Sequence, residues 1–135
     1  NEQKARQVLA AFQFYKEDVN KRVKNLSGGE RIRVRLASLL QLNVNCLIFD
    51  EPTNHIDIPT KEVLEKAVEN FDGTVIFVSH DRYFINKLAE KIIEFHDGHI
   101  STYLGNYDYY KSEKQKRLQA QSQSISAQLT KKQDK

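Results

Sequence analysis

The chain has 135 residues, of which 39% are hydrophobic, which is enough for one ordinary domain with a modest core. It contains no apolar run near the roughly 20 residues that span a bilayer and no signal-peptide pattern at its start, so we do not expect membrane insertion. The net charge of +3 is uneven, because residues 1–110 hold 14 Lys and Arg against 16 Asp and Glu, whereas residues 111–135 hold 7 against 2. Such a basic tail suits an anionic partner such as RNA, or it is a solvated helix or a disordered end.

The single cysteine indicates a reducing compartment. Cys46 lies inside an apolar, strand-like run, where we expect a small buried side chain rather than a redox group. Together with the absence of a targeting or membrane segment, this predicts a soluble, cytoplasmic protein. The first residue is Asn, which suggests an excised piece or a processed chain.

Helices are predicted in the first forty residues. Residues 2–15 carry apolar side chains at helical spacing, and the polar residues 16–26 form a connection or a short helix. The sequence Leu-Ser-Gly-Gly-Glu at 26–30 then opens a helix that ends near residue 42. The apolar face of this helix comprises Ile32, Leu36, Leu39 and Leu40.

The middle of the chain predicts strands separated by a helix. Residues 44–49 and 74–78 lack alternation of polar and apolar side chains, which is typical of strands buried on both sides in a parallel sheet. Between them, residues 59–71 show the apolar stripe of a helix, with Asp57 or Thr60 as its N-cap.

The last third predicts a short helix over about 79–89, then a hairpin. Its strands, 92–95 and 99–103, flank an Asp-Gly turn at 97–98. From about residue 107 the chain is polar and compatible with a helix. The alternation of strands and helices is the order of an α/β fold.

Polar side chains follow both predicted parallel strands. Asp50 and Glu51 come directly after the first strand, and Ser79 and His80 after the second. Because functional residues of such sheets gather at the carboxyl ends of the strands, these positions are candidates for one site. A carboxylate there can hold Mg²⁺ through water, a second can polarise an attacking water, and an imidazole can contact a phosphate. The alternatives are two exposed loop acids and a structural histidine.

A glycine pair opens the predicted helix after residue 26. Gly28 and Gly29 let the backbone approach a ligand closely, and the free amides of a helix start favour an anion. The hydroxyl of Ser27 suits that anion or serves as the N-cap. A plain cap and turn is the alternative.

Taken together and in this order, the motifs resemble the second half of an ABC-type ATPase nucleotide-binding domain. They are "LSGGE" at 26–30, "LIFDEP" at 47–52, "TNHID" at 53–57 and "SHDRYF" at 79–84. The wording "DEPTNHID" followed by "SHDRYF", and the later "YLGNYDYY" at 103–110, resembles the ABC-F class, whose members carry twin ATPase domains and act on the ribosome. The resemblance covers about residues 5–115.

The resemblance implies a role for each matching residue. Asp50 would be the Walker B aspartate that helps to hold Mg²⁺, and Glu51 the catalytic glutamate. His80 would be the switch histidine on the γ-phosphate of ATP. The signature loop, which touches ATP held by a second nucleotide-binding domain, would comprise Ser27, Gly28, Gly29 and Glu30. Asp57, in the D-loop, would couple the two sites.

The resemblance also divides the chain. Residues 1–42 would be part of the helical signature subdomain, and residues 43–110 the C-terminal half of the ATPase core. Residues 111–135 would be a basic tail, helical or disordered. The expected partners are a second nucleotide-binding domain of the same protein and the ribosome or its RNA.

A phosphate-binding loop is missing from these residues, because no GxxxxGK[ST] pattern occurs and none of the five glycines precedes a lysine. We therefore interpret the chain as the C-terminal part of a nucleotide-binding domain cut from a larger protein, inactive by itself. The whole protein would be a translation factor or an antibiotic-resistance factor that protects ribosomes. The alternatives are the ATPase subunit of a membrane transporter and a chromosome-maintenance ATPase.

Overall fold

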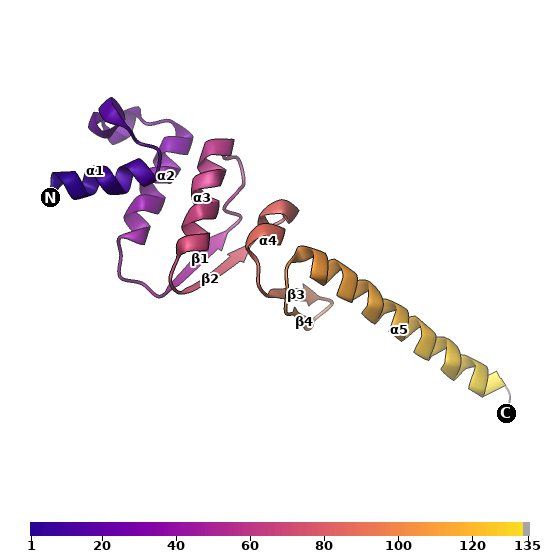
Figure 1. Cartoon of the computed structure of the whole chain (residues 1–135). Helices are drawn as coiled ribbons and strands as arrows, with labels where there is room; N and C mark the ends of the chain where they lie inside the picture. The colour runs from indigo at the N-terminus through magenta and orange to yellow at the C-terminus, as the bar shows by residue number, and fades with distance from the viewer. Residues whose placement is uncertain (134–135) are drawn as a thin grey trace. The chain divides into compact units, whose positions relative to one another are not determined.

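The computed structural model describes residues 1–133 and divides the chain into two compact units, Asn1–Asp81 and Arg82–Lys135 (Figure 1). Residues 134–135, the end of the predicted basic tail, lie outside the described residues. The first unit contains α1 (Glu2–Ala11), α2 (Gly28–Leu40), β1 (Cys46–Asp50), α3 (Ile58–Asn70) and β2 (Thr74–Val78). The second contains α4 (Arg82–Leu88), β3 (Ile92–His96), β4 (His99–Tyr103) and α5 (Tyr107–Gln133). The α/β prediction is confirmed.

The first unit is built on a small parallel sheet. Strands β1 and β2 pair in parallel, with Cys46 opposite Thr74 and Asp50 opposite Val78. Parallel strands need a crossover connection, and α3 supplies it. In Figure 1, α2 and α3 lie side by side next to the strands. The register brings the carboxyl ends of both strands to one edge of the sheet.

Helices α2 and α3 supply four of the eight buried apolar side chains of the first unit. Leu36 and Ala37 of α2 are buried, as are Val63 and Leu64 of α3, and β1 adds Leu47. Leu36, Val63 and Leu64 belong to the predicted apolar stripes of their helices, and Ala37 lies next to the stripe of α2. The burial of these stripes is what holds the sheet edge and both helix starts together.

The prediction that both strands are buried on two sides is wrong. Ile48 of β1 is 74% exposed, and Ile76 and Val78 of β2 are also exposed. Cys46, which we expected to be buried, is exposed as well. The reason is that the sheet of this unit has only two strands, so one face of the apolar strands is left uncovered by the described residues. The apolar run therefore predicted strands correctly and their burial incorrectly.

Helix α1 ends at Ala11, four residues earlier than predicted. Gln13 takes a left-handed φ of 65°, which a continuing helix does not allow. The turn lets Phe12 and Phe14 enter the interior, where they are 7% and 3% exposed. The aromatic residues thus end the helix instead of extending it. Two short 3-10 turns, Lys16–Asn20 and Val23–Asn25, then lead to α2.

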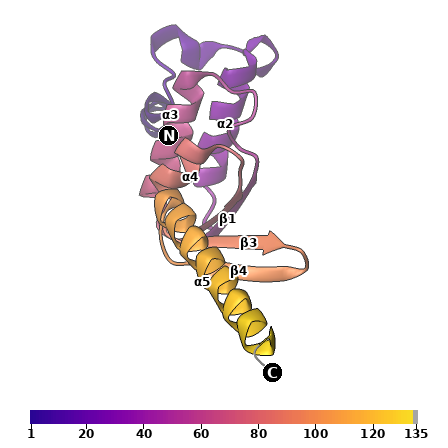
Figure 2. The same ribbon diagram turned by 90° about the vertical axis from the view of Figure 1, so that its right-hand side faces the viewer.

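In the second unit the predicted hairpin is present. Strands β3 and β4 pair antiparallel, with Phe95 opposite Ile100 and His96 opposite His99. The turn residues Asp97 and Gly98 have φ angles of 47° and 74°, as a two-residue hairpin turn requires. Figure 2 shows this hairpin beside the beginning of α5.

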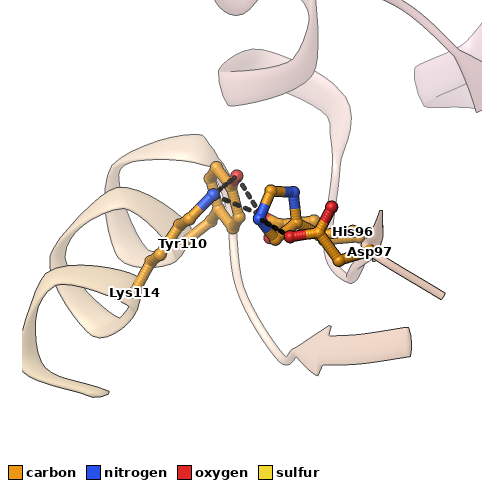
Figure 3. Close-up of polar contacts among 5 residues, drawn as sticks. His96, Asp97, Tyr110 and Lys114 are labelled. Atoms are coloured by element: carbon orange, nitrogen blue, oxygen red, sulfur yellow. Dashed lines mark hydrogen bonds and ion pairs between the residues drawn. The ribbon is translucent and has the colours of Figure 1, made fainter. Parts of the chain in front are cut away.

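Aromatic and charged side chains hold α5 to the hairpin. Tyr103 of β4 is 3% exposed. Its ring packs edge-on against that of Tyr110, with 4.9 Å between the ring centroids, and the Arg117 guanidinium carbon lies 4.3 Å from the Tyr103 centroid. Figure 3 shows Tyr110 and Lys114 of α5 among the polar contacts of this region. The Tyr110 hydroxyl donates to the Glu94 carboxylate, and Lys114 Nζ lies 2.9 Å from the same group. These tyrosines pack within their unit, while Tyr109 stays exposed.

Hydrogen bonds and charge set the protonation of this cluster. Burial by itself would raise the pKa of Glu94, but the hydrogen bonds from Tyr110 and Lys114 outweigh it and lower that pKa. The hydrogen bond to Glu94 also raises the pKa of Lys114. A carboxyl with a lowered pKa stabilises the fold above its ordinary pKa of 4.5, and this contribution is lost as the pH falls through the lowered value.

We therefore expect Glu94→Gln to loosen the start of α5. The amide protection factors of residues 107–114, measured by hydrogen exchange on the whole protein, should fall about tenfold at neutral pH, since a hydrogen bond to a charged group is lost. The difference from the wild type should vanish at acidic pH, where Glu94 is itself protonated. Glu113→Gln is the control, because its partner Arg117 lies 3.6 Å away in a more exposed pair. Equal protection in both variants would contradict the prediction.

Beyond this cluster, the side chains of residues 115–132 of α5 are exposed, including those of Leu118, Ile125 and Leu129. None of the helices within residues 1–133 combines the length and apolar character needed to cross a bilayer.

Candidate functional site

The turn after β1 sets the position of the two acids. Asp50 is the last residue of the strand, and the backbone N–H of Glu51 still donates to the Val78 carbonyl of β2, at 2.8 Å. Glu51 then adopts a left-handed φ of 46°, which is uncommon for a residue other than glycine. Backbone strain of this kind is stored where the surrounding structure holds a residue in a required position. The strand thus ends at Asp50, and the left-handed turn sets the backbone position of Glu51.

Glu51 meets His80 at the sheet edge. Its Oε1 lies 3.3 Å from His80 Nε2, and the backbone N–H of His80 donates to its Oε2 at 3.4 Å. The His80 side chain is 95% exposed, whereas that of Glu51 is 22% exposed. The glutamate is thus held by its neighbours while the imidazole stays accessible to a ligand. The parallel register brings these residues together, as the sequence predicted.

Asp50 differs from Glu51 in having no partner of this kind. It is exposed, and none of the described residues donates a hydrogen bond to its carboxylate. A hard cation such as Mg²⁺ prefers oxygen ligands and usually keeps several waters, so one free carboxylate at an open strand end fits it. Among residues 1–133 no group of three or more His, Cys, Asp or Glu gathers into a metal cage. The donors thus suit an ion shared with phosphate and water.

The Ser27–Glu30 segment forms the first turn of α2. Ser27 is the N-cap, because its hydroxyl accepts from the Glu30 N–H at 3.2 Å. The Glu30 carboxylate oxygen Oε2 lies 3.5 Å from Lys21 Nζ. No atom lies within 4 Å of the place where a side chain at Gly28 would begin. The Ser27 hydroxyl uses only the Glu30 N–H. The other free amides of this turn therefore remain available to an anion.

Asp57 lies against this turn. A Cβ added to Gly29 would lie 2.8 Å from Asp57 Oδ2 and 2.9 Å from Thr60 Oγ1, so the two helix starts touch at this point. Asp57 caps α3 by accepting from the Thr60 N–H at 3.0 Å. The hydrogen bond between the Thr60 side chain and Asp57 lowers the pKa of the Asp57 carboxyl. Burial acts in the opposite direction, while the Thr60 amide and the charge of Arg33 add to the lowering. The cap is therefore charged at neutral pH.

Two contacts of the site were missed by the sequence analysis. Arg33 donates to the fully buried Thr60 hydroxyl at 3.0 Å, and Lys61 Nζ lies 2.7 Å from Asp81 Oδ2. Both join residues 20 or more positions apart, and no local pattern predicts such pairs. The one available signal was that Asp81 follows His80 inside the "SHD" motif.

Comparison with known proteins finds relatives over most of the chain. The ABC transporter family model matches residues 1–54. The chain is 50% identical over 118 residues to the putative ATP-binding protein YdiF of Bacillus subtilis (strain 168), covering 87% of the chain and 18% of that protein. It is 44% identical over 103 residues to ABC transporter F family member 5 of Arabidopsis thaliana, covering 76% of the chain and 15% of that protein. Over three quarters or more of its length, the chain is therefore similar to proteins of the ABC-F class.

Another ABC-F relative is the energy-dependent translational throttle protein EttA of Escherichia coli (strain K12). It is 42% identical over 120 residues, which are 88% of the chain and 22% of EttA. The chain therefore spans only a minor part of the length of the curated relatives it matches.

Solved structures show the same fold. The chain aligns with a TM-score of 0.52 and 23% identity to a chain in the crystal structure of the complex of the archaeal ribosomal stalk protein aP1 and the archaeal ribosome recycling factor aABCE1. The RNase-L inhibitor gives the same values. Each alignment covers 76% of this chain and 21% of the solved chain. The chain thus has the fold of part of these proteins.

Proposed function

We propose that the whole protein is an ABC-F ATPase that closes two nucleotide-binding domains on ATP and uses hydrolysis to drive a conformational switch on the ribosome. The observation that carries this proposal is the contact between Glu51 and His80 at the end of the parallel strands, with Asp50 beside them. A carboxylate, an imidazole and a free second carboxylate at one sheet edge are groups that hydrolysis of a phosphoanhydride can use as general base, phosphate contact and Mg²⁺ ligand.

Within this proposal Glu51 is the general base. Its carboxylate takes a proton from the attacking water. The side chain is only partly buried, so a water molecule can reach it. His80 contacts the γ-phosphate with its exposed imidazole while its backbone stays bonded to Glu51. Asp50 would hold Mg²⁺, which supplies charge neutralisation of the phosphates when bound. ATP and Mg²⁺ are the cofactors that these residues suit.

The remaining residues serve the opposite domain. Ser27, Gly28, Gly29 and Glu30 form the signature loop, whose free amides would donate hydrogen bonds to the γ-phosphate of ATP held by the second domain. Asp57 touches this loop and caps α3, so it couples the loop to the rest of the domain. In this scheme residues 1–42 belong to the signature subdomain, residues 43–110 to the ATPase core and residues 111–135 to a basic tail.

The ribosome is the partner that the proposal favours, and the site of action is the cytoplasm. The name of EttA refers to translation, and the tail adds a basic helix that suits RNA. A membrane-transporter subunit and a chromosome-maintenance ATPase share the same nucleotide chemistry and are the competing outcomes of the test. Protection of ribosomes against antibiotics is one form the activity takes in this class.

The test is fractionation of cells that express the tagged whole protein. We expect it to sediment with ribosomes in the presence of a non-hydrolysable ATP analogue, and the purified protein to hydrolyse ATP in a Mg²⁺-dependent manner. The 135-residue chain is the control, and we expect it to bind ATP weakly and hydrolyse none. Sedimentation with membranes, or with chromatin, would contradict the ribosomal assignment. Tight Mg²⁺-dependent ATP binding by the short chain would contradict the expectation that ATP binding needs a phosphate-binding loop outside these 135 residues.

A further inference from the structure

The first turn of α3 touches two separate segments of the candidate site. On one side Asp57 and Thr60 lie against Gly29 of the signature loop. On the other, Lys61 forms a 2.7 Å ion pair with Asp81, the residue that follows His80. The same turn is itself held firmly, because Asp57 caps it and the fully buried Thr60 receives a hydrogen bond from Arg33. It therefore provides a rigid support for Lys61.

The short turn that carries His80 is held from within and from the side of β1. The Asp81 N–H donates to the Ser79 hydroxyl at 3.0 Å, which closes the turn on itself. The contacts with Glu51 hold His80 from the β1 side. Since the imidazole is almost fully exposed, packing around it does not decide where it points. Its position follows from the backbone of residues 79–81.

We propose that Lys61 is a positioning residue, which holds the Ser79–Asp81 turn through Asp81 and so keeps His80 in place beside Glu51. This inference rests on the proposed function and adds a residue to it. The ion pair is suited to the task because both side chains are partly buried, at 30% and 21% exposure, so solvent screens it less than a surface pair. A group displaced by even about 1 Å costs much of its catalytic effect.

The experiment measures ATP turnover of the whole protein carrying Lys61→Met, which keeps the length of the side chain and removes its charge. We expect kcat to fall about tenfold with KM for ATP changed less than about twofold, as when an interaction acts mainly in the transition state. Lys66→Met is the matched control, because Lys66 is exposed on the same helix and should leave kcat unchanged. The melting temperature is recorded for each variant.

A charge exchange separates positioning from simple loss of stability. Lys61→Asp combined with Asp81→Lys restores an ion pair of the same length, and an aspartate is favourable in the first turn of a helix. We expect the exchange to recover at least half of the lost kcat, while each single change stays impaired. Rescue would support positioning, since a general weakening of the helix would not be repaired in this way.

The outcomes distinguish the inference from the function on which it rests. If the wild type hydrolyses ATP and Lys61→Met matches Lys66→Met, the role of Lys61 is wrong and the proposed function stands. If Lys61→Met lowers kcat only in proportion to a lowered melting temperature, or the exchange gives no rescue, the residue is merely structural and the inference fails. A wild type without Mg²⁺-dependent ATPase activity would overturn both.

Discussion

Glu51→Gln is expected to lower ATP turnover by the whole protein at least about a hundredfold, because an amide cannot accept the proton of the attacking water. The substitution preserves the shape of the side chain, so one oxygen remains to accept from the His80 backbone N–H. ATP binding should persist while hydrolysis stops. The closed, ATP-bound pair of domains should then accumulate.

The measurement pairs steady-state turnover with retention of radiolabelled ATP on a desalting column. Glu62→Gln is the matched control, since Glu62 is exposed on α3 and plays no part in the proposed chemistry. The variant should retain ATP and the control should behave as the wild type does. Full turnover by Glu51→Gln would remove Glu51 from the role of general base.

The second large effect concerns Gly28 and Gly29, the two glycines at the start of α2, which have different surroundings. Gly29→Ala would place a methyl group 2.8 Å from Asp57 Oδ2 and 2.9 Å from the buried Thr60 hydroxyl. One of these groups must then shift, and both belong to the cap of α3. We expect a loss of about 1–3 kcal/mol in stability, the usual cost of overpacking.

Gly28→Ala is the natural control, because nothing lies within 4 Å of the added carbon. Alanine in a helix is favoured over glycine by up to about 1 kcal/mol, so this variant should be as stable as the wild type or slightly more stable. Hydrogen exchange of the amides in the first turns of α2 and α3 is the readout. Equal protection in the two variants would show that the helix starts do not touch as described.

Short-range features were predictable from local residue patterns. The Ser27 cap, the stripes of α2 and α3, and the Asp-Gly hairpin each depend on residues a few positions apart. The end of α1 was not predictable in this way. Gln13 turns the chain so that Phe12 and Phe14 become buried, and burial stabilises this turn only when the rest of the core has formed. The burial of β1 and β2 was also misjudged, since apolar composition says nothing about which neighbours cover a strand.

For the candidate site, the sequence by itself determined that two acids and a histidine follow two strands of a parallel sheet, because strand period and crossover order are properties of local pattern. Only the tertiary structure decided that Glu51 meets His80, that Gly29 lies against Asp57, and that Lys61 pairs with Asp81. The physical reason is that such contacts join residues far apart along the chain. Their distances depend on the pairing of β1 with β2 and on the packing of α2 against α3, which no spacing along the sequence encodes.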